Sequence, residues 1–216
     1  MDDSGFKRPT YNEPVFFAPE PEPDPDGEGS RHLITPTRAV LVLVVLAIVA
    51  VFGLDACARG STEAKAAAVA GELSDREGVR VSCPGPIARV LLYQVNSGWV
   101  AYTEDGPSDE AKLTAEICDG LGRLIDQGPA LDLACLETDA CSAEDQRVAL
   151  GVAVLAHEAA HLSSIIDEAR AECFSYANSE WTALQLGASP ETAGRIPVWQ
   201  REFQAPRMPS RYRGAC

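Results

Sequence analysis

Residues 39–54, AVLVLVVLAIVAVFGL, carry no charge and no strongly polar side chain. Extended upstream to Leu33, with Arg38 snorkelling to the interface, this apolar run approaches the ~20 residues that a bilayer requires. A buried core helix is the alternative, but it is disfavoured because the run has no polar face. The sequence therefore predicts one transmembrane helix at residues 33–54, which divides the 216-residue chain into a leading tail and a longer folding portion.

The leader before this run is too long for a cleavable signal peptide, in which a short basic region precedes the apolar segment. We therefore expect the anchor to be retained. At the end of the run, Leu54-Asp55-Ala56-Cys57 resembles the lipobox of bacterial lipoproteins. Asp55 departs from that pattern, and the long leader also argues against lipidation at Cys57.

The segments on either side of the run differ in composition. Residues 1–32 contain PEPEPDPDGEGS and predict a disordered, acidic, proline-rich cytoplasmic tail, either a solubilising spacer or a contact site for a partner. Residues 55–78 predict a membrane-proximal stalk, with a helix at Thr62–Leu73. Arg31 and Arg38 precede the run, so the positive-inside rule favours a single-pass cell-membrane protein with a cytoplasmic N-terminus.

Cysteine usage supports the same orientation. Six of the seven cysteines follow the stalk, at Cys83, Cys118, Cys135, Cys141, Cys173 and Cys216, and the leading tail has none. An even number without a C-x-x-C pair predicts up to three disulfides in an oxidising compartment, so we expect residues 79–216 to be extracytoplasmic. Cys135 and Cys141 are plausible partners across a loop, and the rest of the connectivity stays open.

Residues 79–216 alternate short β-rich runs with helical patterns. The runs Ala88–Gln94 and Gly98–Thr103 flank Asn96-Ser97-Gly98 and predict a β-hairpin. Helical patterns follow in three places, which are Ser108–Gln127, the apolar stretch that starts near Ser142, and Asp167–Leu186 before Gly187. The sequence thus predicts an α+β domain with a β-hairpin and about three helices, stapled by disulfides.

Charge argues against one class of partner. With a formal net charge of −14 and an expected extracytoplasmic location, the chain is a poor candidate for binding nucleic acid. The C-terminal remainder is nevertheless rich in arginine, at Arg195, Arg201, Arg207, Arg211 and Arg213. Such a basic patch favours contact with the anionic cell envelope or with the protein's own acidic surface.

Two of the three histidines stand in the motif HEAAH, residues 157–161. At i and i+4 on a helix, His157 and His161 lie on one face and can present two nitrogen ligands to one tetrahedral zinc ion. Glu158 lies about 100° further around the helix, where it can reach a water on the metal rather than the metal itself. The spacing therefore predicts two metal ligands and a general base. The alternative is a pair of core histidines satisfied by carboxylates, which would leave several buried polar groups needing partners.

A third ligand must come from beyond the motif. In an unbroken helix Glu168 would lie about 10 Å along the axis from His161, too far for both to bind one ion. Ser163-Ser164 can compete for backbone hydrogen bonds and Asp167 is a good N-cap, so we expect a bend that folds a second helix back on the first. Glu168, Glu172 and Asp167 are the candidates for the third ligand.

HEAAH followed by EARAEC at residues 168–173 resembles the gluzincin-type metallopeptidases, in which a downstream helix carries an E-x-x-x-D/E motif. It is also similar to the small membrane-anchored zinc metallopeptidases of actinobacteria, which have HExxH, a short link and DEAxxEC. The resemblance implies a minimal zincin-like domain, Glu168 as the third ligand and Glu172 as a hydrogen-bond partner of a ligand histidine. The link between the two helices is shorter here than in many gluzincins.

Two tyrosines are candidates for the donor that stabilises the oxyanion of a transition state. Tyr176 lies about two turns beyond Glu168 and near its helix face, and Tyr102 lies in the predicted hairpin. Cys173 is expected to be half of a disulfide rather than a nucleophile, since its acidic neighbours would raise the pKa of a thiol.

The residues favour a membrane-anchored zinc metallopeptidase, a hydrolase in which Glu158 activates a zinc-bound water to cleave a peptide or protein of the cell envelope. A catalytically inactive zincin-like protein, acting as a binding or scaffold module, is the alternative. A purely structural envelope module would require HEAAH to be incidental. Glu158 argues against the inactive alternative, because it has no ligand role and is the residue that a decayed enzyme could lose first.

Overall fold

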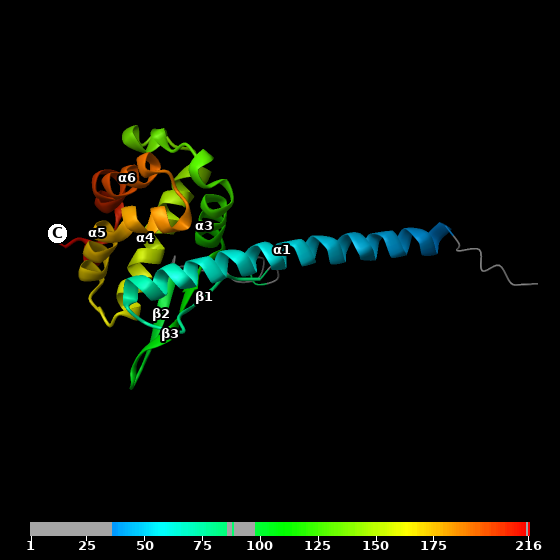
Figure 1. Cartoon of the computed structure of the whole chain (residues 1–216), viewed down its shortest axis with the longest axis horizontal. Helices are drawn as coiled ribbons and strands as arrows, with labels where there is room; N and C mark the ends of the chain where they lie inside the picture. Colours follow the sequence, from blue (N-terminus) through cyan, green and yellow to red (C-terminus); the bar gives the residue numbers. More distant parts are fainter. Residues whose placement is uncertain (1–35, 86–87, 89–97, 215) are drawn as a thin grey trace, which may run out of the picture. The chain divides into compact units, whose positions relative to one another are not determined.

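The computed structural model describes residues 36–85, 88, 98–214 and 216 (Figure 1). Contacts divide the chain into two units, residues 1–42 and 43–216, and the described part of the first is the start of helix α1. The tail predicted at residues 1–32 and nearly all of the strand predicted at 88–94, with the turn that follows it, lie outside the described residues.

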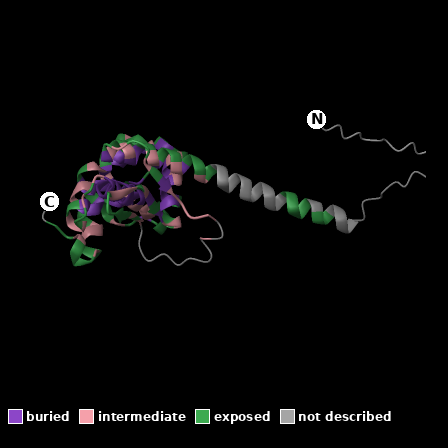
Figure 2. Ribbon diagram, turned by 90° about the horizontal axis from the view of Figure 1, so that it is seen from below, coloured by how far each residue is buried: buried purple, intermediate pink, exposed green. Residues whose placement is uncertain are grey.

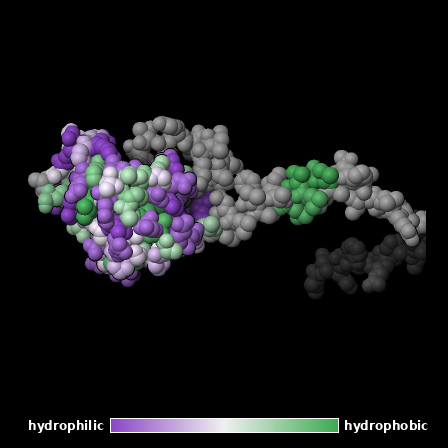
Figure 3. All heavy atoms as spheres, turned by 90° about the horizontal axis from the view of Figure 1, so that it is seen from above, coloured by the Kyte–Doolittle hydropathy of each residue, from purple (hydrophilic) through white to green (hydrophobic). Residues whose placement is uncertain are grey.

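Helix α1, Pro36–Ser74, contains the apolar run that predicts a transmembrane helix at residues 33–54. This prediction is contradicted in the described part of the chain, where no helix is long and apolar enough to cross a membrane. The run continues without a break into the polar residues after Leu54, so it forms the first part of a longer helix and is not a separate element. Figure 3 shows its described apolar side chains, which are exposed at Val40, Leu41 and residues 43–46.

The C-terminal half of α1 belongs to the folded domain. One stripe of it is buried, as the colours of Figure 2 show, and consists of Thr62, Ala66, Val69, Ala70 and Ser74. Spacings of three and four residues place these side chains on one helix face. The helix predicted at Thr62–Leu73 is confirmed. The segment predicted as a stalk, residues 55–78, therefore contributes to the core instead of only preceding it.

A three-stranded sheet packs beside the helices, with strands β1 (Arg80–Ser82), β2 (Gly98–Thr103) and β3 (Gly106–Leu113) in the order β1-β3-β2. β1 pairs with β3 in parallel, and β2 pairs with β3 in antiparallel fashion, with an irregularity between Val100 and Tyr102. The β2–β3 turn reaches a positive φ of 118° at Gly106, a backbone conformation that favours glycine. Because β3 lies between the other two strands, β2 is at an edge of the described sheet.

The helix predicted from Ser108 is wrong in its first part, because Ser108–Leu113 belongs to β3 and helix α3 begins at Ala115. Ala111 and Leu113 are buried while Lys112 between them is exposed, which is the period of a strand. Leu113 also stands four residues before Ile117, which is a helical spacing of apolar residues. Leu113 lies in the strand, so this spacing led to a helix prediction that starts too early.

The remaining helices are α3 (Ala115–Gln127), α4 (Ala143–Leu162), α5 (Glu168–Leu186) and α6 (Pro190–Trp199). Side-chain caps define three of the starts. Ser142 accepts a hydrogen bond from the backbone of Asp145, Asp167 from Arg170, and Ser189 from Thr192. Gly187, in the left-handed conformation, ends α5. The predicted start near Ser142 and the predicted end at Gly187 are confirmed.

The fold class therefore needs correction beyond the membrane helix. The domain is α+β as predicted, but its described residues form a three-stranded sheet and more helices than about three. Helix α6 is the main omission, because Pro197 lies inside it and the surrounding residues show little periodicity.

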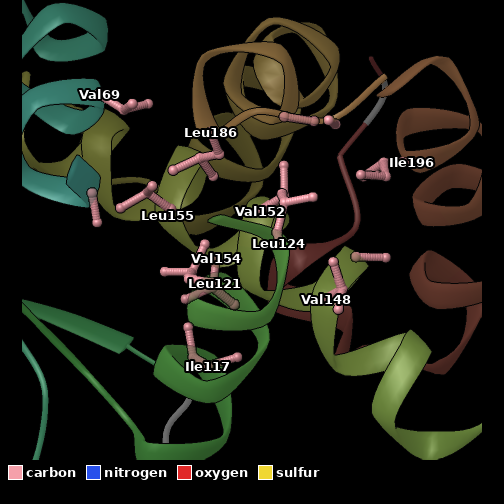
Figure 4. Packing of buried hydrophobic residues seen from close by; sticks show 14 of the residues in the cluster. Val69, Ile117, Leu121, Leu124, Val148, Val152, Val154, Leu155, Leu186 and Ile196 are labelled. Carbon is pink, nitrogen blue, oxygen red and sulfur yellow. The ribbon is translucent and has the colours of Figure 1, made fainter. Parts of the chain in front are cut away.

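Helix α4 lies at the centre of the domain and packs against both α3 and α5 (Figure 4). Its close approach to α3 depends on Gly120, where an added Cβ would lie 2.2 Å from the carbonyl oxygen of Arg147. Apolar side chains fill the space between the two helices, including Ile117, Leu121, Leu124, Val148 and Val152. This packing fixes α4 firmly, and α4 carries the HEAAH motif at its C-terminal end.

All six cysteines beyond the stalk form disulfides, as predicted. The pairs are Cys83–Cys118, Cys135–Cys141 and Cys173–Cys216. The pairing predicted for Cys135 and Cys141 is confirmed. The third bridge joins the last residue of the chain to the first turns of α5, which places the C-terminal segment near the HEAAH motif.

Candidate metal centre

The last turns of α4 bury polar groups in an otherwise apolar helix. His157 and His161 are each 8% exposed and Glu158 is 3% exposed, while their neighbours Ala159 and Ala160 are fully buried. Burying three titratable groups together costs free energy unless each finds a partner. The partners of these side chains therefore indicate what the site is built to do.

The chain reverses direction directly after the motif. Helix α4 ends at Leu162, Ser164 takes a left-handed conformation with φ of 71°, and the amide of Ile165 donates to the carbonyl of Ala160. The hydroxyl of Ser163 also donates to the carbonyl of Ala160, which is the predicted competition for the helix backbone. Asp167 then caps α5, so the expected bend between the two helices is confirmed.

This reversal brings Glu168 against both histidines. Its Oε2 lies 3.1 Å from Nε2 of His157 and 3.5 Å from Nε2 of His161. One ligand atom from each of these three residues falls within 4.8 Å of the others. Of the acidic residues considered as third ligand, Glu168 is the one whose carboxylate joins the two imidazoles.

The other nitrogen of each imidazole is held by a hydrogen-bond acceptor. His157 Nδ1 lies 3.0 Å from Oε2 of Glu172, and His161 Nδ1 lies 2.7 Å from the carbonyl oxygen of Ile165. A carbonyl can only accept, so His161 donates from Nδ1, and in its neutral form it presents a lone pair at Nε2. The position of Glu172 matches the role that the resemblance implies for it.

These contacts test whether a metal ion fits. With both Nδ1 atoms donating outward, two imidazole lone pairs and a carboxylate oxygen converge on one point, which is unfavourable without a cation between them. Two nitrogens and one oxygen form a donor set that suits zinc, and partners at the outer nitrogens are typical of metal-binding histidines. The residues therefore fit a zinc ion. The second group of potential ligands, Cys135, Cys141 and Asp145, does not, because its cysteines are bonded to each other.

Electrostatics at the site reflect burial and the cluster of carboxylates. Burial raises the pKa of Glu158 to about 7, with His157 opposing the rise and Glu168 adding to it. Burial lowers the pKa of His157, but the hydrogen bond with Glu172 and the nearby carboxylates outweigh it and raise that pKa overall. Among the described residues, Oε2 of Glu158 is buried without a hydrogen-bond partner.

Two hollows share His157 and Glu158 in their linings. The first, of about 400 Å³, is lined on one wall by β2 and the link before α5, with Trp99, Tyr102 and Ile166, and contains His161 and Glu168. The second, of about 350 Å³, is lined by α4 and the C-terminal segment. Both hollows include Gly98, His157, Glu158, Arg211 and Tyr212.

The structure does not bring both predicted tyrosines to this opening. Tyr176 is buried beside Glu172, where burial and that carboxylate raise the pKa of the phenol, and it lines neither hollow. Tyr102 lines the first hollow, but its hydroxyl donates to the carbonyl oxygen of His161 at 3.0 Å. Neither hydroxyl is therefore directed at the point where the metal ligands meet.

Sequence reasoning named Arg211 only as part of a basic patch and missed Tyr212. Both lie in the short helical turn Ser210–Tyr212, and the ring centroid of Tyr212 is 5.9 Å from that of His157. Arg211 donates to the hydroxyl oxygen of Tyr212 at 3.2 Å. The available signal was Cys216, because its bridge to Cys173 ties this arginine-rich remainder to α5, the helix that carries Glu168.

Comparison of the chain with protein-family models, with curated proteins and with solved structures found no match. Function is therefore inferred from the geometry of the site and from the chemistry of its residues.

Proposed function

We propose that this protein is a zinc-dependent metallopeptidase of the gluzincin type. One observation carries the proposal: two imidazole nitrogens and the Glu168 carboxylate converge at a point beside a buried, unpartnered Glu158, at the junction of two hollows. A core histidine pair satisfied by carboxylates would account for both Nε2 atoms facing Glu168, but not for the buried, unpartnered Oε2 of Glu158 beside them.

When bound, a zinc ion supplies Lewis acidity that polarises a peptide carbonyl and lowers the pKa of a water toward about 7. His157, His161 and Glu168 would hold it. Glu172 and the Ile165 carbonyl fix the orientation of the two imidazoles, since each accepts from an Nδ1 atom.

Glu158 is the general base in this proposal. Its carboxylate lines both hollows and has no hydrogen-bond partner for Oε2 among the described residues, so it can accept a proton from an attacking water. It then returns that proton to the nitrogen of the leaving amine. In the metal-free protein burial raises the pKa of this carboxyl, which is the kind of shift found at groups that exchange protons in active sites.

Tyr212 replaces Tyr176 as the donor to the developing oxyanion. Arg211 donates to the Tyr212 oxygen, so the phenolic hydrogen is left to point elsewhere, and the ring lies against His157 in both hollows. Tyr102 is less suited, because its hydrogen is already given to the backbone of His161.

Three disulfides in one domain favour an oxidising, extracytoplasmic location. We infer that the substrate is a peptide or protein of the cell envelope. Membership of the small actinobacterial metallopeptidases agrees with the spacing of HEAAH and EARAEC and belongs to the same proposal.

The test combines metal content with hydrolysis, using the full-length oxidised protein. We expect about one zinc per chain and cleavage of a mixed peptide library by the unaltered protein. Glu158→Gln should keep the metal and abolish cleavage, whereas Glu168→Ala should lose the metal. Glu180→Ala, an exposed carboxylate on the same helix as Glu168, is the control and should behave like the unaltered protein.

The outcomes separate the proposal from its alternatives. Zinc bound without cleavage of any library member would indicate an inactive zincin-like binding module. Absence of zinc from the unaltered protein would remove the metallopeptidase proposal entirely.

A further inference from the structure

The C-terminal strap, residues 205–214 with Cys216, contributes to the lining of both hollows at the candidate site. It is fastened at its end by the Cys173–Cys216 bridge. Near that end an added Cβ at Gly214 would lie 3.0 Å from Cβ of Ala169, so the strap packs closely on the first turn of α5, next to Glu168. The strap therefore forms one wall of both hollows and presents Arg211 and Tyr212 to them.

The two arginines of the strap that line a hollow differ in their partners. Arg207 forms an ion pair with Asp139, which also accepts from Trp199. Arg211 instead donates to the Tyr212 hydroxyl and stacks on the Tyr212 ring, with its guanidinium carbon 4.9 Å from the centroid. No carboxylate of the described residues lies within ion-pair distance of Arg211, which is exposed. Its guanidinium thus keeps donors available toward the hollows.

The guanidinium of Arg211 lies beside a site that is rich in negative charge. Three carboxylates, Glu158, Glu168 and Glu172, cluster around the histidines, and the chain carries a formal net charge of −14. A bound zinc ion would offset part of this negative charge, and a second cation at the entrance would give an anionic group of the substrate a direct partner. A guanidinium suits this task because its planar donors match both oxygens of a carboxylate.

We propose that Arg211 is a specificity-determining residue that binds a carboxylate of the substrate close to the cleaved bond. The substrate class is therefore a peptide with an acidic side chain near that bond or with a free C-terminal carboxylate. The position of this carboxylate next to a cleaved bond rests on the proposed peptidase function. The binding of the carboxylate by Arg211 does not require catalysis.

Binding is measured with the full-length, oxidised, zinc-loaded protein carrying Glu158→Gln, so that no probe is consumed. Three N-acetylated alanine-based hexapeptides serve as probes: one with a single central Glu and an amidated C-terminus, one with Gln in its place, and an all-alanine peptide with a free C-terminal carboxylate. Titration calorimetry gives their affinities. The first and third probes distinguish an acidic side chain from a chain terminus as the source of the carboxylate.

At least one anionic probe should bind about tenfold more tightly than the Gln probe, the size expected for a charge-assisted hydrogen bond. Adding Arg211→Gln should abolish the preference, and Arg211→Lys should keep part of it. Arg213→Gln is the matched control, because Arg213 is exposed on the same strap and lines neither hollow. A preference that survives Arg211→Gln, or equal binding of all three probes, would overturn the inference.

A second measurement guards against a purely structural effect. Arg211 is close enough to Glu168 to interact with it electrostatically. If its role were only to balance Glu168, Arg211→Gln would change zinc affinity and leave the probe preference intact, which contradicts the proposal. Unfolding temperatures of the Arg211 and Arg213 variants should match.

Failure of the inference and failure of the proposed function give different results. Cleavage by the unaltered protein with no Arg211-dependent preference would refute only the inference. An Arg211-dependent preference in a protein that cleaves nothing would support the inference and refute the peptidase.

Discussion

At the scale of single residues, the outer nitrogens of the two histidines carry more information than the motif itself. The spacing of HEAAH predicts which side chains share a helix face, but not which nitrogen each presents. The hydrogen bonds of His157 to Glu172 and of His161 to the Ile165 carbonyl settle this, because both rings then direct Nε2 inward. Of these two partners, Glu172 is a side chain that can be substituted, whereas the Ile165 carbonyl belongs to the backbone.

Replacing Glu172 should therefore weaken metal binding without removing a ligand. We expect Glu172→Ala to lower zinc affinity about 10- to 100-fold, because His157 loses the acceptor that fixes its tautomer. Glu172→Gln should lower it less, since the amide oxygen can still accept from Nδ1. Competition with a chromogenic chelator measures the affinities. Equal affinities in all three proteins would show that Glu172 has no orienting role.

Gly98 places the edge of the sheet directly on Glu158, the proposed general base. An added Cβ would lie 2.6 Å from Oε1 of Glu158 and 2.9 Å from Cγ1 of Val154. The flexible end of Glu158 is what can move, so Gly98→Ala should displace the carboxylate. We expect zinc to be retained and the rate of hydrolysis to fall by about 100-fold.

Gly194→Ala is the control for this substitution, because nothing lies within 4 Å of the added Cβ. The kinetic comparison uses kcat/KM for one peptide, with metal content measured in parallel. Loss of zinc from Gly98→Ala, or an unchanged rate, would contradict the placement of Gly98 against the base.

At the scale of elements, the sequence predicts those helix starts, helix ends and bends that are set by local chemistry. The caps at Ser142 and Asp167, the end of α5 at Gly187 and the bend before α5 all follow from residues that act on their own backbone. The first turn of the predicted helix at Ser108 fails because tertiary pairing with β1 and β2 claims that segment as a strand.

The same contrast applies to the site. His157, Glu158, His161 and Glu168 are predictable, because one helix spacing and one bend bring them together. Arg211 and Tyr212 are not, since their place depends on a disulfide whose partner cannot be deduced from six cysteines. Helix α6 is missed for a related reason, because packing stabilises it despite Pro197.

The α4–α5 link stores strain at Ser164, whose φ is 71°. Glycine adopts this conformation without a steric penalty, so Ser164→Gly should stabilise the protein by about 0.5–1 kcal/mol, after the entropy of the added glycine is subtracted. Ser163→Gly should do the opposite, because Ser163 has φ of −82° and its hydroxyl donates to Ala160. Urea denaturation compares the two. Destabilisation by Ser164→Gly would mean that the link is not strained.

At the scale of the whole molecule, a central helix with buried titratable groups links folding to protons and to metal. In the metal-free protein the pKa of Glu158 is raised from 4.5 to about 7, and that of His157 is raised above 6.5. Both groups therefore hold more protons in the folded state than in the unfolded state across this range. Their contribution to stability is present at low pH and is lost as pH rises through about 7.

We therefore expect metal-free protein to melt at a higher temperature at pH 5.5 than at pH 8. Glu158 alone accounts for roughly 2 kcal/mol of the difference between these two pH values, because part of its contribution is already lost at pH 5.5. Carboxyls such as Asp139, whose pKa is lowered by its hydrogen bond with Arg207, titrate below this window and do not obscure it. Thermal unfolding in the presence of a chelator measures the difference, and Glu158→Gln should reduce it.

Zinc should reverse this dependence, because the metal competes with protons for His157 and is bound most tightly when the imidazole is neutral. The gain in unfolding temperature on adding zinc should accordingly be larger at pH 8 than at pH 5.5. Glu168→Ala should remove most of the gain at both pH values, while Glu180→Ala should leave it intact. A metal-free protein that becomes more stable from pH 5.5 to pH 8 would show that Glu158 and His157 are not the buried, proton-holding groups of this domain.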